Sequence, residues 1–440
     1  MQSQFEPPSG TRDFLAAEYE EREQAFGIIR SVFSRYGYEP LQTPAFERLD
    51  VLLGKYGDEG DKLVFKILRR GEHEASGEAD LALRYDLTVP LARVAAAYEG
   101  QLPSPYKRYA MGPVWRADRP GKGRFREFVQ CDLDTLGSAS ILADAEALCA
   151  QHDALAELGI PEFTIQVNSR HVLAGLLEAC KIPAELGDGV LTSLDKLDKM
   201  RPDAVAAELV GRGLGEADAG ELVTMMTAPD AEDRIRAALK PSEEGMAGLA
   251  EVDELLALVT AQAPPGRFSF TPRLVRGLSY YTGPIWEVAA PGVSSSIGSG
   301  GRYDHLIAQL GGPDTPATGS SLGVERILSL LPASSAFQRG RLDVAVTIMS
   351  EELAGESFGL AAAARAAGLR ASVYLGASGK LGKQLKWASD QGARWCLIYG
   401  PREREAGAVK VRDMLSREEA DVPVADIGSH LSYAEAGQHG

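Results

Sequence analysis

Cysteine is scarce in this chain, and its spacing excludes two kinds of small stabilised domain. The four cysteines, Cys131, Cys149, Cys180 and Cys396, lie far apart and form no C-x-x-C pair. Neither a disulfide framework nor a zinc knuckle is therefore expected. A protein-bound structural metal is not expected either, because the six histidines show no H-E-x-x-H or similar ligand spacing.

Long apolar runs and targeting signals are also lacking. No run approaches the ~20 apolar residues that a membrane-spanning helix needs. The first residues, MQSQFEPPSGTRDF, contain neither the basic nor the apolar region of a signal peptide. We therefore expect a cytoplasmic protein with no membrane partner.

Positive charge is deficient over the chain as a whole. The 46 Lys and Arg against 62 Asp and Glu give a formal net charge of −16. This balance argues against general attraction to nucleic acid, although a polynucleotide partner needs a basic surface only where it makes contact. A length of 440 residues allows two or three domains.

One segment reverses the overall charge. Residues 106–136 contain two β-prone stretches, 106–117 and 125–136, joined by a polar, turn-prone loop. From Lys107 to Arg126 there are seven Lys or Arg and one acidic residue. A strand, basic loop, strand arrangement suggests an anionic ligand, since guanidinium groups bind phosphate through paired hydrogen bonds. A solvated hairpin with charged faces is the alternative.

The first part of the chain is predicted to form a helix followed by short strands. Apolar residues recur at helical spacing over residues 12–36, and two strands are expected at 64–68 and 81–85. Asp86 and Thr88 stand where a strand gives way to a helix, a position that presents a carboxylate and a hydroxyl to a ligand. Capping of the following helix is the alternative role.

The rest of the chain divides into a helical segment, a return to strands and a terminal domain. Residues 171–263 are rich in Ala, Leu, Glu and Asp at helical periodicity and hold no catalytic-looking cluster. Strands return at 268–274 and 285–289, and a glycine-rich turn at 319–323 leads into a helix. After a linker at 331–340, alternating strands and helices predict an α/β domain with a largely parallel sheet.

Five short motifs together resemble those of class II aminoacyl-tRNA synthetases. V-W-R-A-D at 114–118 is similar to motif 2, and the G-x-x-x-G-x-E-R form at 319–326 is similar to motif 3. Pro44, after the expected long helix, stands where motif 1 belongs. R-G-L-S-Y-Y at 276–281 and G-G-R-Y-D at 300–304 resemble the two signatures of the histidyl-tRNA synthetase family. The resemblance covers essentially the whole chain.

The resemblance implies an α+β fold and a defined reaction. A class II antiparallel-sheet catalytic domain would occupy residues 1–170 and 264–332, with a helical insertion at 171–263 and an α/β anticodon-binding domain at 341–440. The family forms homodimers through motif 1. The implied activity is ATP-dependent conversion of histidine to histidyl-adenylate, followed by transfer to the 3′ end of tRNA(His).

An arginine-lined ATP site is implied as well. The carboxylate that attacks ATP is itself anionic, so the site must neutralise the repulsion and hold the reactants in line. Arg116 matches the family residue that binds the α-phosphate and the carboxylate, and Arg276 matches the catalytic arginine near the α-phosphate. Arg326 matches the residue that covers adenine and reaches the γ-phosphate. Asp118, as acceptor from the adenine amino group, and Arg124 complete the ATP-binding set, and Mg²⁺ is expected with the β- and γ-phosphates.

Histidine recognition is implied at two subsites. The substrate ammonium needs hydrogen-bond acceptors, and its imidazole needs partners for both ring nitrogens. Tyrosines at such positions would, on their own, more often be core aromatics. The matching residues are Asp86, Thr88 and Gln130 for the ammonium and Asp134, Tyr280 and Tyr281 for the imidazole.

Two signature positions carry qualifications of their own. Ser279 stands where the family usually has Asp, which bears on the hydrogen bonding behind Arg276. Arg302 has a structural alternative, an ion pair that pins the Gly300-Gly301 turn.

Contacts with tRNA are expected in two places. Lys122 lies in the basic loop, which in the family closes over ATP and touches the acceptor stem. Lys380, Lys383 and Lys386 fall at i, i+3 and i+6 of one predicted helix in the terminal domain, a spacing that suits a phosphate-tracking surface. A mobile charged loop and a solvated helix face are the alternatives.

The competing interpretation is a catalytically silent paralogue that binds histidine and acts with ATP phosphoribosyltransferase. Such paralogues generally lack the catalytic arginine and the anticodon-binding domain. This chain contains both Arg276 and a C-terminal α/β pattern. The sequence therefore favours the synthetase.

Overall fold

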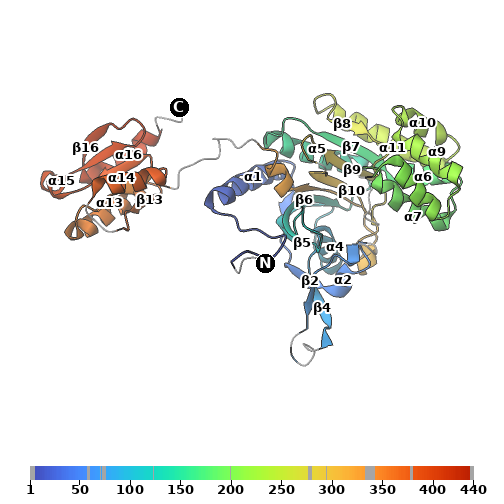
Figure 1. Ribbon diagram of the computed structural model, residues 1–440, viewed down its shortest axis with the longest axis horizontal. Coiled ribbons are helices and arrows are strands. Elements are labelled where there is room, and N and C mark those ends of the chain that lie inside the picture. Colours follow the sequence, from blue (N-terminus) through green and yellow to red (C-terminus); the bar gives the residue numbers. More distant parts are fainter. Residues whose placement is uncertain are drawn as a thin grey trace. The chain divides into compact units, whose positions relative to one another are not determined.

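The chain forms two compact units, Met1–Ala333 and Ser334–Gly440, which are described one at a time (Figure 1). Three expected functional or signature positions, Lys122, Arg276 and Ser279, lie outside the described residues, as does most of the predicted linker. The computed structural model describes residues 5–56, 60–69, 71, 76–121, 123–198, 200–275, 280–293, 295–331, 342–376 and 380–436.

An eight-stranded sheet forms the centre of the first unit. Its strands are β1 (Glu39–Pro40), β5 (Tyr106–Trp115), β6 (Glu127–Leu136), β7 (Thr164–Ser169), β8 (Phe268–Phe270), β9 (Pro284–Ala289), β10 (Gly298–Arg302) and β11 (Ala317–Gly323). The spatial order is β1-β5-β6-β11-β10-β9-β7-β8. The pairs at the two ends are parallel and the five between them antiparallel. The expected α+β class with an antiparallel-rich sheet is confirmed.

The predicted strand, loop, strand segment is the long β5–β6 hairpin. The two strands pair from Tyr106 opposite Leu136 to Trp115 opposite Glu127. Side chains alternate between the two faces of a strand, so β6 presents Gln130, Asp132 and Asp134 on one face. The hairpin therefore carries a row of polar side chains through the middle of the sheet.

The expected glycine-rich turn at 319–323 is wrong, because these residues belong to β11. They pair with β6 on one side and with β10 on the other. Glycine serves close approach here, since a Cβ on Gly319 would overlap the carboxylate of Asp134 and one on Gly300 would overlap the carbonyl oxygen of Gly319. The motif 3 helix, α12 (Val324–Leu328), starts only after the strand ends.

Helices and a small sheet surround the central sheet. Helix α5 is rich in alanine and packs closely on β11, with Ser140 Oγ accepting from Leu142 N at its start at 3.3 Å. A second, three-stranded sheet has the order β2-β4-β3 and projects from the unit in Figure 1. The elements are α1 (Ala16–Arg35), α2 (Leu49–Leu52), α4 (Thr88–Ala97), α5 (Ile141–Glu157), β2 (Phe46–Arg48), β3 (Lys66–Leu68) and β4 (Ala79–Leu83).

The expected helical segment is present between β7 and β8. Its long last helix packs against β7, β8 and the first helix of the segment, and Figure 1 shows the helices gathered at one end of the unit. Their buried residues are continuous with the core of the sheet. The helices are α6 (Arg170–Ala179), α7 (Ala184–Leu194), α8 (Pro202–Gly211), α9 (Glu216–Thr227), α10 (Ala231–Ala238) and α11 (Glu243–Thr260).

The second unit has a five-stranded sheet of order β13-β12-β14-β15-β16. The expected largely parallel sheet is wrong in part: β13, β12 and β14 are parallel, but β15 and β16 pair antiparallel. A parallel crossover needs a dozen or more residues, and only residues 399–407 separate β14 from β15. The elements are β12 (Val344–Val346), α13 (Ala354–Ala366), β13 (Ala371–Val373), α14 (Leu381–Asp390), β14 (Trp395–Ile398), α15 (Pro401–Ala406), β15 (Ala408–Asp413), β16 (Glu419–Pro423) and α16 (Ile427–Ala436).

Across both units, no described helix combines the length and apolar character that crossing a bilayer requires.

Candidate active site

A buried polar row on the β5–β6 hairpin forms the floor of the candidate site. Gln130, Asp132 and Asp134 follow one another on one face of β6 and are 9%, 2% and 3% exposed. The register places Ser321 of β11 opposite Asp132, and Arg108 of β5 opposite Asp134. Charged residues are rarely fully buried unless they are paired. A row of this kind in the middle of a sheet therefore indicates a ligand site rather than core packing.

Asp134 is held in place by two side chains, one at each carboxylate oxygen. Arg108, which is fully buried, forms an ion pair with it at 2.8 Å and also donates to Leu87 O at 2.9 Å. Tyr303 OH donates to the other carboxylate oxygen. Burial raises the pKa of Asp134, while Arg108 and the hydrogen bond from Tyr303 oppose that rise. The carboxylate is consequently oriented before any ligand arrives.

Asp86 has one engaged carboxylate oxygen and one available one. Its Oδ1 accepts from Val89 N at 3.0 Å, from Thr88 N at 3.2 Å and from Tyr56 OH at 3.2 Å. The alternative predicted for this residue, capping of the next helix, is therefore present. Its Oδ2 is buried and accepts from no residue that the structure describes. Burial raises the pKa of Asp86, against the backbone N–H of Val89 and the attraction of Arg116.

Arg116 follows β5 directly and lies over aromatic rings. Its Nε donates to Tyr85 O at 3.1 Å, and its guanidinium carbon lies 4.2 Å from the Tyr85 ring centroid and 5.2 Å from that of Phe128. Stacking of this kind holds a guanidinium plane while leaving other N–H groups available to a ligand.

Arg326 faces the same space from the motif 3 helix. Its Nε donates to Gly123 O at 3.1 Å and its Nη1 to Ser296 O at 2.7 Å. Burial lowers the pKa of Arg326, and repulsion from Arg116 and Arg124 lowers it further. Arg116 and Arg124, from the end of β5 and the basic loop, therefore lie close enough to Arg326 for the three positive charges to repel one another.

Asp118 is engaged by one of these arginines. Arg124 Nη2 lies 2.6 Å from Asp118 Oδ1, and the Asp118 side chain is 13% exposed against 57% for Arg124. The loop residue Arg124 is therefore tied to the site at its exposed edge.

Hydrogen bonds and an ion pair of Glu325, which the sequence did not predict, join motif 2 to motif 3. Both carboxylate oxygens of Glu325 accept from Val129 N at 3.2 Å, and one of them pairs with Arg22 of α1 at 2.9 Å. Arg12 lies over the Phe125 ring at 3.8 Å. These contacts fix the base of the basic loop next to Arg326.

The two predicted signature tyrosines lie at the floor of the site. Tyr280 packs on Tyr281 with ring centroids 4.9 Å apart and meets Tyr303 edge-on at 5.9 Å. Tyr280 also raises the pKa of Tyr56, the residue that hydrogen-bonds to Asp86. The aromatic cluster therefore spans the space between Asp86 and Asp134.

Two family profiles account for nearly all of the chain. The profile described as Histidyl-tRNA synthetase matches residues 10–327, and that described as Anticodon binding domain matches residues 343–432. The chain belongs to the histidyl-tRNA synthetase family. It is accordingly an aminoacyl-tRNA synthetase by family, with a class II catalytic unit and an anticodon-binding unit.

Curated relatives and solved structures agree with this assignment. The chain is 38% identical to a histidine–tRNA ligase of Gloeobacter violaceus, over 96% of this chain and 97% of the relative. It is 39% identical to the ligase of Paracoccus denitrificans, over 93% and 90%. A histidyl-tRNA synthetase from a Nostoc species superposes with a TM-score of 0.79 at 29% identity, over 98% and 100%.

A further likeness concerns the fold alone. A Bacillus halodurans structure titled as an ATP phosphoribosyltransferase regulatory subunit/histidyl-tRNA synthetase has a TM-score of 0.73 at 23% identity, over 88% of this chain and 96% of that one. The regulatory alternative is not favoured, because the curated relatives are ligases and the anticodon-binding profile matches the second unit.

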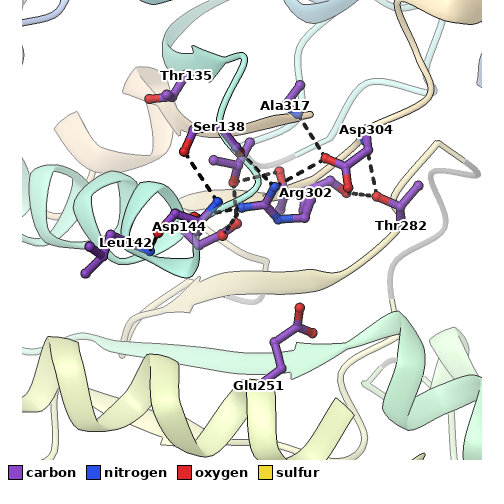
Figure 2. Close-up of polar contacts among 12 residues, drawn as sticks. Thr135, Ser138, Leu142, Asp144, Glu251, Thr282, Arg302, Asp304 and Ala317 are labelled. Carbon is purple, nitrogen blue, oxygen red and sulfur yellow. Dashed lines mark hydrogen bonds and ion pairs between the residues drawn. The ribbon is translucent and has the colours of Figure 1, made fainter. Parts of the chain in front are cut away.

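In this synthetase the described part of the histidine signatures also builds a structural network (Figure 2). Arg302 forms a buried ion pair with Asp144 of α5, lies 3.3 Å from Asp304, and donates to the carbonyl oxygens of Ser138 and Ser140. The expectation that it pins a turn is wrong in its location, since Gly300 and Gly301 lie within β10. Its ion pairs join β10 to α5 instead.

The raised pKa of Asp132 is expected to make the folding stability of the protein depend on pH. Burial raises its pKa to about 7, so the folded protein keeps a proton there that the unfolded chain releases near pH 4. The free energy of unfolding therefore falls as the pH rises from about 4 to about 7. Asp132→Asn removes this penalty and is expected to stabilise the free protein by about 2 kcal/mol more at pH 8 than at pH 5.5.

Thermal unfolding of the wild type and Asp132→Asn at both pH values measures this difference. Asp233→Asn, at an exposed position on α10, serves as the control and should show no such pH-dependent gain. An Asp132→Asn gain that is equal at both pH values would contradict a raised pKa.

Proposed function

We propose that the protein activates histidine with ATP and transfers it to tRNA(His). The observation that carries the proposal is the position of Arg116, which stacks on Tyr85, the neighbour of Asp86, and lies near enough to Arg326 to repel it. Its charge lowers the pKa of Asp86 on one side and that of Arg326 on the other. A carboxylate and an α-phosphate bound at the same guanidinium would be held together for reaction.

In the first step a histidine carboxylate oxygen attacks the α-phosphorus of ATP, and pyrophosphate leaves. We assign Arg116 and Arg276 to the charge that develops at the α-phosphate. Arg326 would cover the adenine, with Asp118 accepting from its amino group and Arg124 at the exposed edge. In the second step the terminal hydroxyl of tRNA attacks the adenylate carbonyl, and AMP leaves.

Histidine would lie along the floor of the site. Its ammonium would face Asp86, Thr88 and Gln130, and its imidazole would face Asp134 with Tyr280 and Tyr281 around it. Arg108 and Tyr303 hold Asp134 in an acceptor position. A side chain that cannot donate there would leave a buried carboxylate unpaired, at a cost of about 1–3 kcal/mol.

ATP would enter as its Mg²⁺ complex. The described residues contain no group of three carboxylate, histidine or cysteine side chains that could hold an ion, and Glu325 is occupied by Arg22 and Val129. The ligands of Mg²⁺ would therefore come chiefly from the phosphates and water, as this ion prefers. It is part of the substrate rather than of the protein.

The partner assignments follow from the family. We propose a homodimer that works in the cytoplasm, where tRNA is charged; a monomeric mass by analytical ultracentrifugation at assay concentrations would contradict the dimer.

We assign four lysines to tRNA contact: Lys122 in the basic loop, and Lys380, Lys383 and Lys386, which are all exposed on or next to α14. Unchanged charging after reversal of these charges would contradict that assignment.

Histidine-dependent exchange of pyrophosphate into ATP tests the proposed reaction. The wild type should exchange only when histidine is present, and equal exchange with other amino acids would contradict the substrate. Arg276→Ala is expected to remove most of the rate, because the charge on the α-phosphate loses a fixed partner. The exposed Lys240→Ala is the control and should leave the rate unchanged.

A further inference from the structure

Three buried oxygen atoms at the floor of the site have neither a hydrogen bond nor an ion pair from the residues that are described, whereas a fourth, Asp134 Oδ2, has the ion pair with Arg108 at 2.8 Å. The three are Asp86 Oδ2, Gln130 Oε1 and Asp132 Oδ1. The residues that carry them are at most 9% exposed. Buried polar atoms in folded proteins are nearly always hydrogen-bonded. Three such acceptors therefore indicate a ligand that donates hydrogen bonds.

The three acceptors belong to one neighbourhood. Gln130 and Asp132 lie two residues apart on the same face of β6, and both interact with Ser321 of β11. Gln130 Nε2 donates to Ser321 Oγ at 2.8 Å, and a hydrogen bond from Ser321 lowers the pKa of Asp132. Arg108 links Asp86 to this strand, since it donates to Leu87 O at 2.9 Å and pairs with Asp134 at 2.8 Å. Burial is the main cause of the raised pKa of Asp132, and the charge of Asp86 adds to it.

The number and kind of these atoms match one chemical group. A primary ammonium has three N–H donors and no acceptor. We propose that Asp132 is a specificity-determining residue that accepts a hydrogen bond from the substrate ammonium, together with Asp86 and Gln130. The inference rests on the proposed function, in which the substrate is histidine and its ammonium lies beside Asp86 and Gln130.

Asp132 and Asp86 are the floor carboxyl groups that form no ion pair with a residue that the structure describes. Asp134 is paired with Arg108 and accepts from Tyr303. Arg108 also lowers the pKa of Asp132, but its ion pair is made with Asp134. A buried carboxylate without a cationic partner is costly, and an incoming ammonium supplies that partner.

Two analogues of histidine separate a contact to the ammonium from a general effect on the pocket. Histidinol keeps the ammonium and the imidazole, whereas 3-(imidazol-4-yl)propionate keeps the imidazole and lacks the ammonium. Each is tested as an inhibitor of histidine-dependent pyrophosphate exchange in the wild type, Asp132→Ala and Asp132→Asn. Glu251→Gln, which changes a part-buried carboxylate of α11 bonded to Ser169, is the control.

Asp132→Ala is expected to weaken histidinol by about 10- to 100-fold, since a hydrogen bond to a charged group is lost. Asp132→Asn should weaken it by less, because it keeps the shape and one acceptor while losing the charge. Inhibition by the propionate should be unchanged in both variants, and Glu251→Gln should alter neither analogue.

Equal weakening of both analogues, or unchanged inhibition by histidinol, would overturn the inference while leaving histidine activation intact. If Asp132→Ala does not fold, the isosteric Asp132→Asn gives the same comparison. Wild-type exchange that proceeds without histidine would instead overturn the proposed function itself, before any variant is compared.

Discussion

Replacement of Arg116 by alanine is expected to lower kcat for histidine-dependent pyrophosphate exchange by about 10²- to 10³-fold, the effect of removing one fixed donor from a developing negative charge. The structure gives the reason in the position of this side chain. Tyr85 and Phe128 hold its guanidinium, and its charge acts on both Asp86 and Arg326.

Two further variants make the Arg116 experiment specific. Arg116→Lys keeps the charge but loses the planar pair of donors, so its rate should fall between those of the wild type and Arg116→Ala. Arg119→Ala changes an exposed arginine of the same loop and should leave the rate unchanged. A loss of rate as large for Arg119→Ala as for Arg116→Ala would show that loop charge, rather than the position of Arg116, matters.

Arg302→Met is expected to destabilise the catalytic unit by about 3–5 kcal/mol, because it leaves the buried carboxylate of Asp144 without its partner. Asp144 is fully buried, and Thr318 Oγ1 donates to its other oxygen at 2.7 Å. Urea unfolding followed by fluorescence measures the loss. The double variant Arg302→Met/Asp144→Leu should recover part of it, since no unpaired charge then remains.

An exposed ion pair provides the contrast for Arg302. Arg48 pairs with Asp50 at the surface, where both side chains are largely exposed. Arg48→Met should therefore leave the urea concentration at the midpoint of unfolding almost unchanged. A similar midpoint for Arg302→Met and the wild type would contradict the structural role. If Arg302→Met raises the KM for histidine more than the KM for ATP, the substitution has also displaced Tyr303, the next residue along the chain, which donates to Asp134.

Local sequence patterns were sufficient for the elements whose signal is local. The β-prone stretches on either side of the basic loop predicted the β5–β6 hairpin, and the helical periodicity of residues 171–263 predicted its helices. The motifs V-W-R-A-D, G-x-x-x-G-x-E-R and G-G-R-Y-D were enough to indicate the family. These features depend on residues a few positions apart, which any single sequence displays.

Pairing across the sheet was decided by the tertiary structure alone. Residues 319–323 looked like a turn because glycine favours turns. They instead form β11, which pairs with both β6 and β10, and Gly319 leaves space for the Asp134 carboxylate. Residues 408–413 looked like another parallel strand, yet the short connection before them permits only an antiparallel pair.

By itself, the sequence determined which candidate groups the chain carries: arginines that we assign to phosphate, and carboxylates and tyrosines that we assign to the amino-acid substrate. Only the fold decided how those groups are paired. Arg108 carries no distinctive local signal, and the motifs that contain Tyr303 and Glu325 do not reveal their partners, which are distant in the chain. Ion pairing and burial depend on distance in space rather than along the chain, and among the described residues they leave Asp132, like Asp86, without an ion pair.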